Sequence, residues 1–297
     1  MTGEWRAMLI ATLLCAQFST FTLLRAEAHD VTCVPTLLLW SEIVKGLVAF
    51  GMARRDVDRL FCAPLAIVPP VLTFAAMNVV SMWTSSRVEP SLYVVFMQLK
   101  LPWTVLLSWL VLHKRFARSQ LAAIAFITVS CVNIVGPGGC RHALLAIDPL
   151  VGSGLVLETM LSALMGVYMQ RVFGSSLADL WVRNLELALL SLPLYVYGVY
   201  TYKCAPLPTP NGAILVALSS LGGILAALAL LWCGATAKTI ATSMSIVLVT
   251  SIEHTVHWRL PSLALASFYT IATLSVLLYA DAAVAIEHKS NKSRECE

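Results

Sequence analysis

The run YVVFMQLKLPWTVLLSWLV, from Tyr93 to Val111, decides the fold, because it is apolar over the length of a membrane-spanning helix and carries one charge, Lys100, near its middle. A spanning helix needs about 20 mostly apolar residues. A lysine at its centre costs about 2.5 to 3.5 kcal/mol on insertion scales, so it needs a partner or a function. At about 100° per residue, Tyr93, Lys100 and Thr104 share one helix face. We expect this face to look inward onto a ligand.

The composition indicates an integral membrane protein. Of the 297 residues, 59% are hydrophobic and 12% are charged, about half the charged fraction of an ordinary soluble domain. The mean hydropathy is +0.81. The net charge of +4 is dispersed over short connections, so membrane lipid is the expected surroundings and nucleic acid is not an expected partner.

Ten apolar stretches are long enough to span a membrane, and the connections between them are short and polar. The chain is therefore predicted to be an all-α integral membrane protein with ten transmembrane helices in one membrane domain, residues 1–297. The predicted spans are 7–24, 33–53, 60–83, 90–112, 119–136, 149–170, 179–200, 210–233, 235–255 and 261–281.

Basic residues in the connections predict the orientation, because cytoplasmic loops carry an excess of lysine and arginine. With a cytosolic N-terminus, eleven basic residues lie on the cytosolic side: Arg6, Arg54, Arg55, Arg59, Lys114, Arg115, Arg118, Arg171, Lys289, Lys292 and Arg294. Five lie on the opposite side: Arg25, Arg87, Arg141, Lys203 and Arg259. Both termini are therefore expected in the cytosol.

The basic residues within spans repeat at one offset of 138 positions, which relates Lys100 to Lys238, Thr104 to Thr242 and Lys45 to Arg183. This offset predicts two five-helix halves, residues 1–140 and 141–284, followed by a cytosolic tail, 285–297. Because five is odd, the second half must be inverted relative to the first. Inverted halves are typical of secondary transporters, whose binding site lies near the midplane.

Lys100 and Lys238 each begin a K-x-x-x-T pattern, which places Thr104 and Thr242 one turn further along the same faces. Two such faces indicate an anion site. Lys238 lies near the end of its span, so its alternative is to reach the membrane interface. The alternative for Lys100 is a structural ion pair with a glutamate of another span, either Glu42, Glu158 or Glu186.

Other polar residues within the spans suggest further roles. Glu42 and Lys45 are spaced i, i+3 and are expected to form a structural pair. Arg183 belongs to a second polar cluster, beside Asn184. The amides of Asn184 and Asn78 can both donate to and accept from a nucleobase or a sugar, and the alternative for each is a contact with a neighbouring helix.

The sequence does not indicate an enzyme, a metal site or a cofactor. The eight cysteines include no C-x-x-C pair and predict no disulfide framework, although Cys140 and Cys204 could pair on an oxidising face. His254 and His257, beside Glu253, sit at a span end with too few neighbouring ligands to predict metal binding. Catalytic or nucleotide-hydrolysing motifs are not found.

Several segments together resemble the nucleotide-sugar transporter family, the Golgi carriers for UDP-galactose, UDP-N-acetylglucosamine and CMP-sialic acid within the drug/metabolite transporter superfamily. The segments that carry this resemblance are Glu42 to Lys45, Asn78, Gln98 to Lys100, Ser162 to Tyr168 (SALMGVY), Trp181 to Leu185 (WVRNL), Leu221 to Ile224 (LGGI) and Lys238 to Leu248 (KTIATSMSIVL).

The resemblance implies a fold of two inverted halves and exchange of a cytosolic nucleotide sugar for a lumenal nucleoside monophosphate, in the Golgi membrane or alternatively the endoplasmic reticulum. It also implies that Lys100 and Lys238 meet phosphate. The residues that it places along the pocket are Asn78, Tyr93, Ser162 and Asn184. A homodimer is an open alternative to a monomer.

The residues after Asn184 bear on the substrate. The CMP-sialic acid branch tends to have tyrosine and serine where this chain has Ala188 and Leu190, so a UDP-sugar is favoured. Two alternatives to a nucleotide-sugar carrier stay open: another exporter of phosphorylated or small metabolites from the same superfamily, and a non-transporting membrane scaffold.

Overall fold

The computed structural model is an all-helical bundle over the residues that it describes, with no strand among them. These residues are 4–27, 33–54, 56–60, 64–85, 87–88, 90–135, 147–172, 176–205, 210–256 and 261–294. The helices are α1 (Glu4–Glu27), α2 (Val34–Ala53), α3 (Pro64–Ser85), α4 (Pro90–Met97), α5 (Lys100–Leu112), α6 (Arg118–Val135), α8 (Pro149–Val172), α9 (Leu177–Thr201), α10 (Pro210–Trp232), α11 (Gly234–Val256) and α12 (Leu263–Arg294), with a short 3-10 helix η1 (Val57–Arg59).

Seven of the described helical stretches are long and apolar enough to cross a membrane, as expected of an integral membrane protein. The apolar parts of α3 and α6 are shorter, Ala66–Ser81 and Arg118–Ile134, and α9 carries Asp179, Arg183 and Glu186. All ten predicted ranges coincide with helix to within a few residues, except that α12 continues past 281 to Arg294.

The fourth predicted range, 90–112, is not one continuous helix. Helix α4 ends at Met97 and α5 begins at Lys100, with a turn at Gln98 and Leu99. Pro102 explains the position of the break, because a proline lacks a backbone N–H and its ring clashes with the carbonyl four residues earlier, here that of Gln98. Lys100 therefore stands in the first turn of a helix, where the peptide dipoles favour anions.

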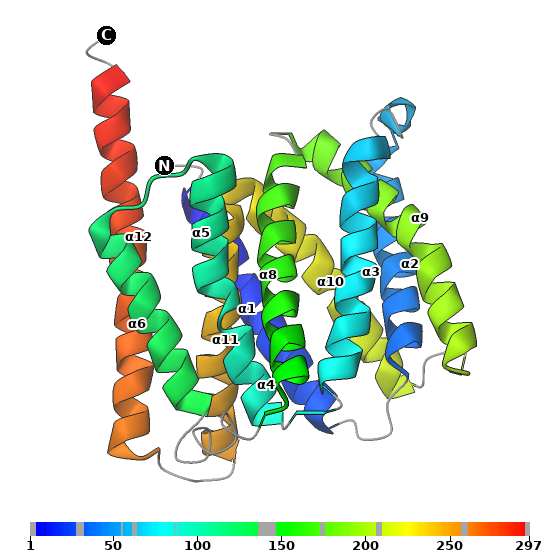
Figure 1. Cartoon of the computed structure of the whole chain (residues 1–297). Coiled ribbons are helices and arrows are strands. Elements are labelled where there is room, and N and C mark those ends of the chain that lie inside the picture. The colour runs from blue at the N-terminus through cyan, green and yellow to red at the C-terminus, as the bar shows by residue number, and fades with distance from the viewer. Residues whose placement is uncertain are drawn as a thin grey trace.

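Successive helices run in opposite directions along the bundle, apart from α4 and α5, which run the same way, and α1 begins at the end of the bundle where α12 ends (Figure 1). Helix α2 packs along α9 at one side, and α6 packs along α12 at the other. Between these pairs, α8 packs against α3 and α5, while α1 packs against α10 and α11. This arrangement leaves the middle of the bundle lined by α2, α3, α8, α9, α10 and α11.

A disulfide joins Cys33, just before α2, to Cys204, just after α9, with 5.6 Å between their Cα atoms. The prediction of no disulfide framework is therefore wrong, and so is the pairing of Cys204 with Cys140, which lies outside the described residues. The bond forms because α2 and α9 are packed side by side. In the same place, Thr36 donates to the carbonyl of Ala205 at 2.7 Å. The start of α2 and the end of α9 lie at the end of the bundle opposite the one where α1 begins and α12 ends (Figure 1).

Gly154 marks a close approach between α8 and α3. A Cβ atom at Gly154 would lie 2.9 Å from Thr84 Cγ2 and 3.1 Å from Trp83 Cζ3, whereas one at Gly166, further along α8, would meet nothing within 4 Å. Overpacking of this kind costs about 1 to 3 kcal/mol. We expect Gly154→Ala to lower the unfolding temperature in detergent by several degrees, and Gly166→Ala to leave it unchanged or higher. Equal unfolding temperatures for the two variants would contradict the close α3/α8 contact.

Candidate functional site

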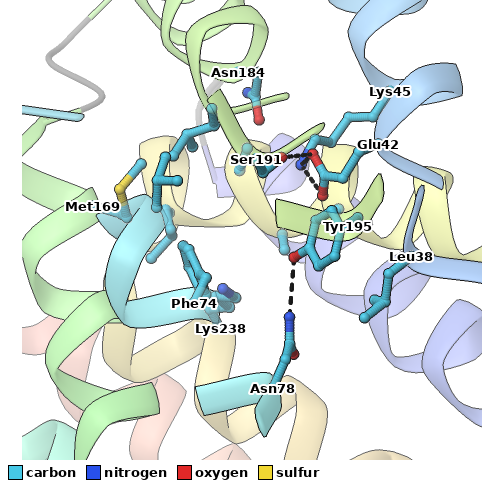
Figure 2. A pocket seen from close by; sticks show the side chains of 16 residues that line it. Leu38, Glu42, Lys45, Phe74, Asn78, Met169, Asn184, Ser191, Tyr195 and Lys238 are labelled. Atoms are coloured by element: carbon cyan, nitrogen blue, oxygen red, sulfur yellow. Dashed lines mark hydrogen bonds and ion pairs between the residues drawn. The ribbon is translucent and has the colours of Figure 1, made fainter. Parts of the chain in front are cut away.

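A cavity of about 280 Å³ lies in the middle of the bundle, and Figure 2 shows it from close by. Its volume is just under the lower bound of about 300 Å³ for sites that enclose small molecules. One part of the wall is apolar and includes Phe74, Met169 and Leu187. The polar part of the wall consists of Glu42, Lys45, Asn78, Asn184, Ser191, Tyr195 and Lys238. Such a mixture of apolar surface and a few convergent polar groups is typical of a ligand site.

Two of the cations around the cavity are neutralised within their own helices. Lys45 Nζ lies 2.6 Å from Glu42 Oε2, the i, i+3 ion pair that their spacing predicts. Ser191 Oγ is 3.5 Å from the same glutamate oxygen. Arg183 and Glu186 form a second such pair at 2.6 Å. The structure also places Glu42 and Lys45 on the cavity wall, which their interpretation as purely structural residues did not include.

Lys238 contributes an uncompensated charge to the cavity. Its side chain lines the cavity, as does that of Phe74 (Figure 2). Within the described part of the chain, no carboxylate oxygen lies within 4.0 Å of its ammonium. Lys238 is in the second turn of α11, close to the end of the helix where backbone N–H groups favour anions. The interior of the bundle thus presents a cation without its own anion.

The start of α11 is fixed by a neighbouring helix. Gly234 has a φ angle of +81°, a left-handed conformation that favours glycine. Gln170, on α8, accepts the backbone N–H of Ala235 at 2.8 Å. This contact holds the first turn of α11, and with it Lys238, against α8.

The two predicted asparagines both reach the cavity. Asn78 Nδ2 donates to the Tyr195 hydroxyl at 3.0 Å, from α3 to α9 (Figure 2). Asn184 is 2% exposed and donates to the Leu180 carbonyl of its own helix at 3.0 Å. Tyr195 and Ser191 were not predicted. Their spacing after Asn184, seven residues to Ser191 and four more to Tyr195, is a helical stripe that could have revealed them.

Lys100 lies outside the described cavity wall, although its charge is within electrostatic reach of Lys238 and of Glu158 on α8. Tyr93 is also outside this wall, and its hydroxyl donates to Glu158 Oε1 at 2.6 Å. Ser162 lies on α8, one turn beyond Glu158. Tyr93 and Ser162 therefore belong to the part of the bundle around Lys100 rather than to the cavity.

The two threonines of the K-x-x-x-T patterns turn their hydroxyls to their own helices. Thr104 donates to the Lys100 carbonyl at 2.7 Å, and Thr242 donates to the Thr239 carbonyl at 2.8 Å. Thr104 Oγ1 also lies 3.4 Å from Thr239 Oγ1, so α5 and α11 meet at these two hydroxyls. Thr104 therefore marks a contact between α5 and α11, whereas Thr242 bonds within its own helix.

The described residues do not place His254 in a set of metal ligands. His254 Nδ1 lies 2.9 Å from the Thr250 carbonyl of its own helix, and His257 lies outside the described part. Among the residues described, no group of three histidine, cysteine or acidic side chains is placed to hold a metal ion.

The sequence model described as "Nucleotide-sugar transporter" matches residues 62–280, well over half of the chain. The chain belongs to the nucleotide-sugar transporter family. Proteins of this family are transporters and not enzymes, which agrees with the prediction from the sequence and confirms the resemblance described above.

Proteins similar to this chain include transporters that are named for UDP-sugars. It is 29% identical over 248 residues to the UDP-galactose translocator of Bos taurus, a match that covers 78% of this chain but 62% of the bovine protein. It is 24% identical to the UDP-galactose/UDP-N-acetylglucosamine transporter srf-3 of Caenorhabditis elegans, over 90% of this chain and 80% of that protein. A known crystal structure has the same fold, with a TM-score of 0.72, 16% identity, and coverage of 92% of this chain and 96% of that one.

Proposed function

We propose that this chain is an antiporter that exchanges a cytosolic nucleotide sugar, a UDP-sugar, for a lumenal nucleoside monophosphate by alternating access. The observation that carries the proposal is Lys238, a cation with no described anion nearby, on the wall of a central cavity that also presents two asparagines. The relatives named for UDP-galactose and UDP-N-acetylglucosamine support a UDP-sugar rather than CMP-sialic acid.

Each part of the substrate has a matching group in this proposal. Lys238 and Lys100 bind the phosphates, since charge-assisted hydrogen bonds to phosphate are stronger than neutral ones. Asn78, held by Tyr195, and Asn184 contact the base and ribose through their amides. Because the cavity holds only about 280 Å³, admitting a whole nucleotide sugar requires the helices to move apart, as alternating access demands.

The helix contacts support ten spans in two inverted halves. If the two halves are equivalent, α1 corresponds to α8, α3 to α10 and α5 to α11. The packing obeys this relation, because α1 contacts α10 and α11 just as α8 contacts α3 and α5. The pairs α2/α9, α5/α11 and α6/α12, whose members would be equivalent, pack against each other. Helices of one half therefore find their partners largely in the other, and the interior lies between the halves.

The disulfide supports the proposed orientation. Disulfides persist in oxidising compartments, and Cys33 and Cys204 adjoin the start of α2 and the end of α9, which lie opposite the end of the bundle where α1 begins and α12 ends. That end is then lumenal and both termini are cytosolic, in agreement with the distribution of basic residues. A Golgi membrane, with the endoplasmic reticulum as the alternative, meets these conditions.

We expect a thiol reagent of low membrane permeability to label Cys33 and Cys204 in sealed Golgi vesicles only after reduction and only when the lumen is made accessible. A Cys33→Ser, Cys204→Ser double variant is the control for these two sites.

We also expect no glycan at Asn291, which begins an N-x-S sequence in the tail. A glycan there would mean that the orientation is reversed.

Uptake by purified, reconstituted protein tests the function directly. Vesicles loaded with UMP are expected to accumulate radiolabelled UDP-galactose or UDP-N-acetylglucosamine, and external UMP is expected to compete more strongly than CMP or GMP. Stronger competition by CMP would favour CMP-sialic acid as the substrate. Uptake of none of these nucleotide sugars, from a folded protein, would favour another metabolite exporter or a scaffold.

A further inference from the structure

Glu158 on α8 is a buried carboxylate whose role the proposed transport cycle has not yet included. Of the glutamates in the helices around the cavity, Glu42 is paired with Lys45 and Glu186 with Arg183. Glu158 has no cation within 4.0 Å among the described residues, although it is only 5% exposed. A buried carboxylate is costly unless hydrogen bonds or a nearby cation offset its charge.

Hydrogen bonds hold the Glu158 carboxylate in place. Tyr93, on α4, donates its hydroxyl proton to Oε1 at 2.6 Å, and Ser81, on α3, lies 2.8 Å from the Tyr93 oxygen, to which it can donate in turn. Thr84 Oγ1 lies 3.2 Å from Oε2 and 2.9 Å from the Val80 carbonyl, so these two acceptors share its proton. The phenol proton of Tyr93 is thus the main fixed donor to this carboxylate.

The same carboxylate belongs to the part of the bundle that holds Lys100. Tyr93 lies on α4, and Lys100 is the first residue of the following helix, α5. Since Tyr93 touches Glu158, and α8 packs against α5, Glu158 lies on the side of the bundle to which Lys100 belongs. The Lys100 charge is within electrostatic reach of Glu158. No direct ion pair forms at 4.0 Å or less between these two described residues, so Lys100 is free to turn toward another anion.

Three charged residues of the described interior, Lys100, Lys238 and Glu158, have no ion-pair partner within 4.0 Å. The Glu42/Lys45 and Arg183/Glu186 pairs are each neutral, which leaves two positive charges, on Lys100 and Lys238, and one negative charge, on Glu158. Without nucleotide the net charge of these three groups is +1 rather than +2. Enclosing one uncompensated charge costs less than enclosing two.

We propose that Glu158 is the built-in counter-charge of Lys100 in the carrier without nucleotide, and that it determines how readily the empty carrier reorients. The inference rests on the proposed nucleotide exchange. In the empty carrier, Lys100 stays directed at Glu158. When a dianionic nucleotide enters, Lys100 turns to the phosphate, and the Glu158 carboxylate keeps the hydrogen bond from Tyr93.

The measurement is the ratio of UDP-sugar uptake by UMP-loaded vesicles to uptake by empty vesicles. In Glu158→Gln the amide keeps the side-chain shape and still accepts from Tyr93, but the negative charge is lost and both lysines stand uncompensated. The ratio is expected to rise at least tenfold over that of the wild type, because uptake by empty vesicles falls while exchange continues. An unchanged ratio would overturn the inference.

A second variant is expected to lower the uptake ratio, and it keeps the proposal testable if the Glu158→Gln protein does not fold. Tyr93→Phe keeps the ring and the Glu158 charge but removes the proton that stabilises the carboxylate once Lys100 has turned to phosphate. Loaded exchange is expected to slow relative to empty uptake, so the ratio falls. A rise in the ratio of Tyr93→Phe, or no change, would contradict the role of Glu158.

Asp281→Asn is the control, because it also removes one carboxylate charge but at an exposed position of α12, outside the interior. Its ratio is expected to equal that of the wild type, and a rise as large as that of Glu158→Gln would overturn the assignment to Glu158. Failure of wild-type protein to exchange nucleotides at all would instead reject the proposed function, so the two failures are distinguishable.

Discussion

Replacing Lys238 by glutamine is expected to slow UDP-sugar uptake by reconstituted protein at least tenfold, while the protein remains folded. Lys238 lies on the cavity wall and has no described carboxylate within 4.0 Å, so its charge is available to a phosphate. Hydrogen bonds to charged groups contribute about 1.5 to 3 kcal/mol. At 1.36 kcal/mol per tenfold change, this corresponds to about 10- to 150-fold.

Lys203→Gln is the control for this prediction, because Lys203 is an exposed lysine in the connection after α9. Its removal changes the total charge by the same amount and is expected to leave uptake unchanged. Initial rates are compared at equal amounts of reconstituted protein. Normal uptake by the Lys238→Gln variant would mean that this lysine has a structural role only.

Lys100→Gln is expected to lower uptake by at least tenfold as well, since Lys100 supplies the second positive charge.

Vesicles loaded with UMP are expected to take up UDP-sugar at least tenfold faster than empty vesicles. A nucleoside monophosphate carries close to two negative charges at neutral pH, because its second phosphate pKa is near 6. It can therefore supply a counter-charge to both Lys100 and Lys238 on the return step, as the UDP-sugar does on the forward step, while Glu158 keeps its hydrogen bond from Tyr93. An empty carrier must instead close around Lys238 without a counter-charge, even with Glu158 directed at Lys100.

One enclosed lysine costs about 2.5 to 3.5 kcal/mol, which corresponds to a slowing of about 10². Water retained in the cavity reduces this cost, so tenfold is the smallest ratio that we expect. Loading with uridine separates charge from base recognition, because uridine has the same base and ribose but no phosphate. If uridine accelerates uptake as much as UMP does, or if loaded and empty vesicles give equal rates, the lysines do not control the return step.

The helices were predictable because each range is apolar over a spanning length and is bounded by polar connections. The range 149–170, for example, is Pro149–Val172 in the structure. The break between α4 and α5 was not predicted. The sequence shows that Pro102 removes one hydrogen bond, but whether a helix then bends or ends depends on its neighbours.

The site was predictable in part. Lys238, Asn78 and Asn184 stand out in a sequence because polar groups are rare in apolar spans, and all three reach the cavity. Tyr195 was not predicted, and Glu158 was named only as one of three possible ion-pair partners of Lys100, since the contacts of both residues are with partners on other helices, Asn78 and Tyr93.

The disulfide partner of Cys204 could not be predicted from sequence spacing either, because that partner lies beside another helix. Cys33 and Cys204 are 171 residues apart, and nothing local indicates that α2 and α9 are adjacent. Sequence periodicity describes one helix at a time, whereas the partner across an interface depends on how the helices assemble.

The Cys33–Cys204 bond also has a consequence for the integrity of the chain. It connects a residue just before α2 to one just after α9, so a protease that cuts anywhere between positions 33 and 204 leaves two fragments that remain covalently attached. Residues 1–140 and 141–297, synthesised as separate polypeptides, would likewise become one species once the bond forms. Such a pair would migrate as a single band on a denaturing gel and separate only after reduction.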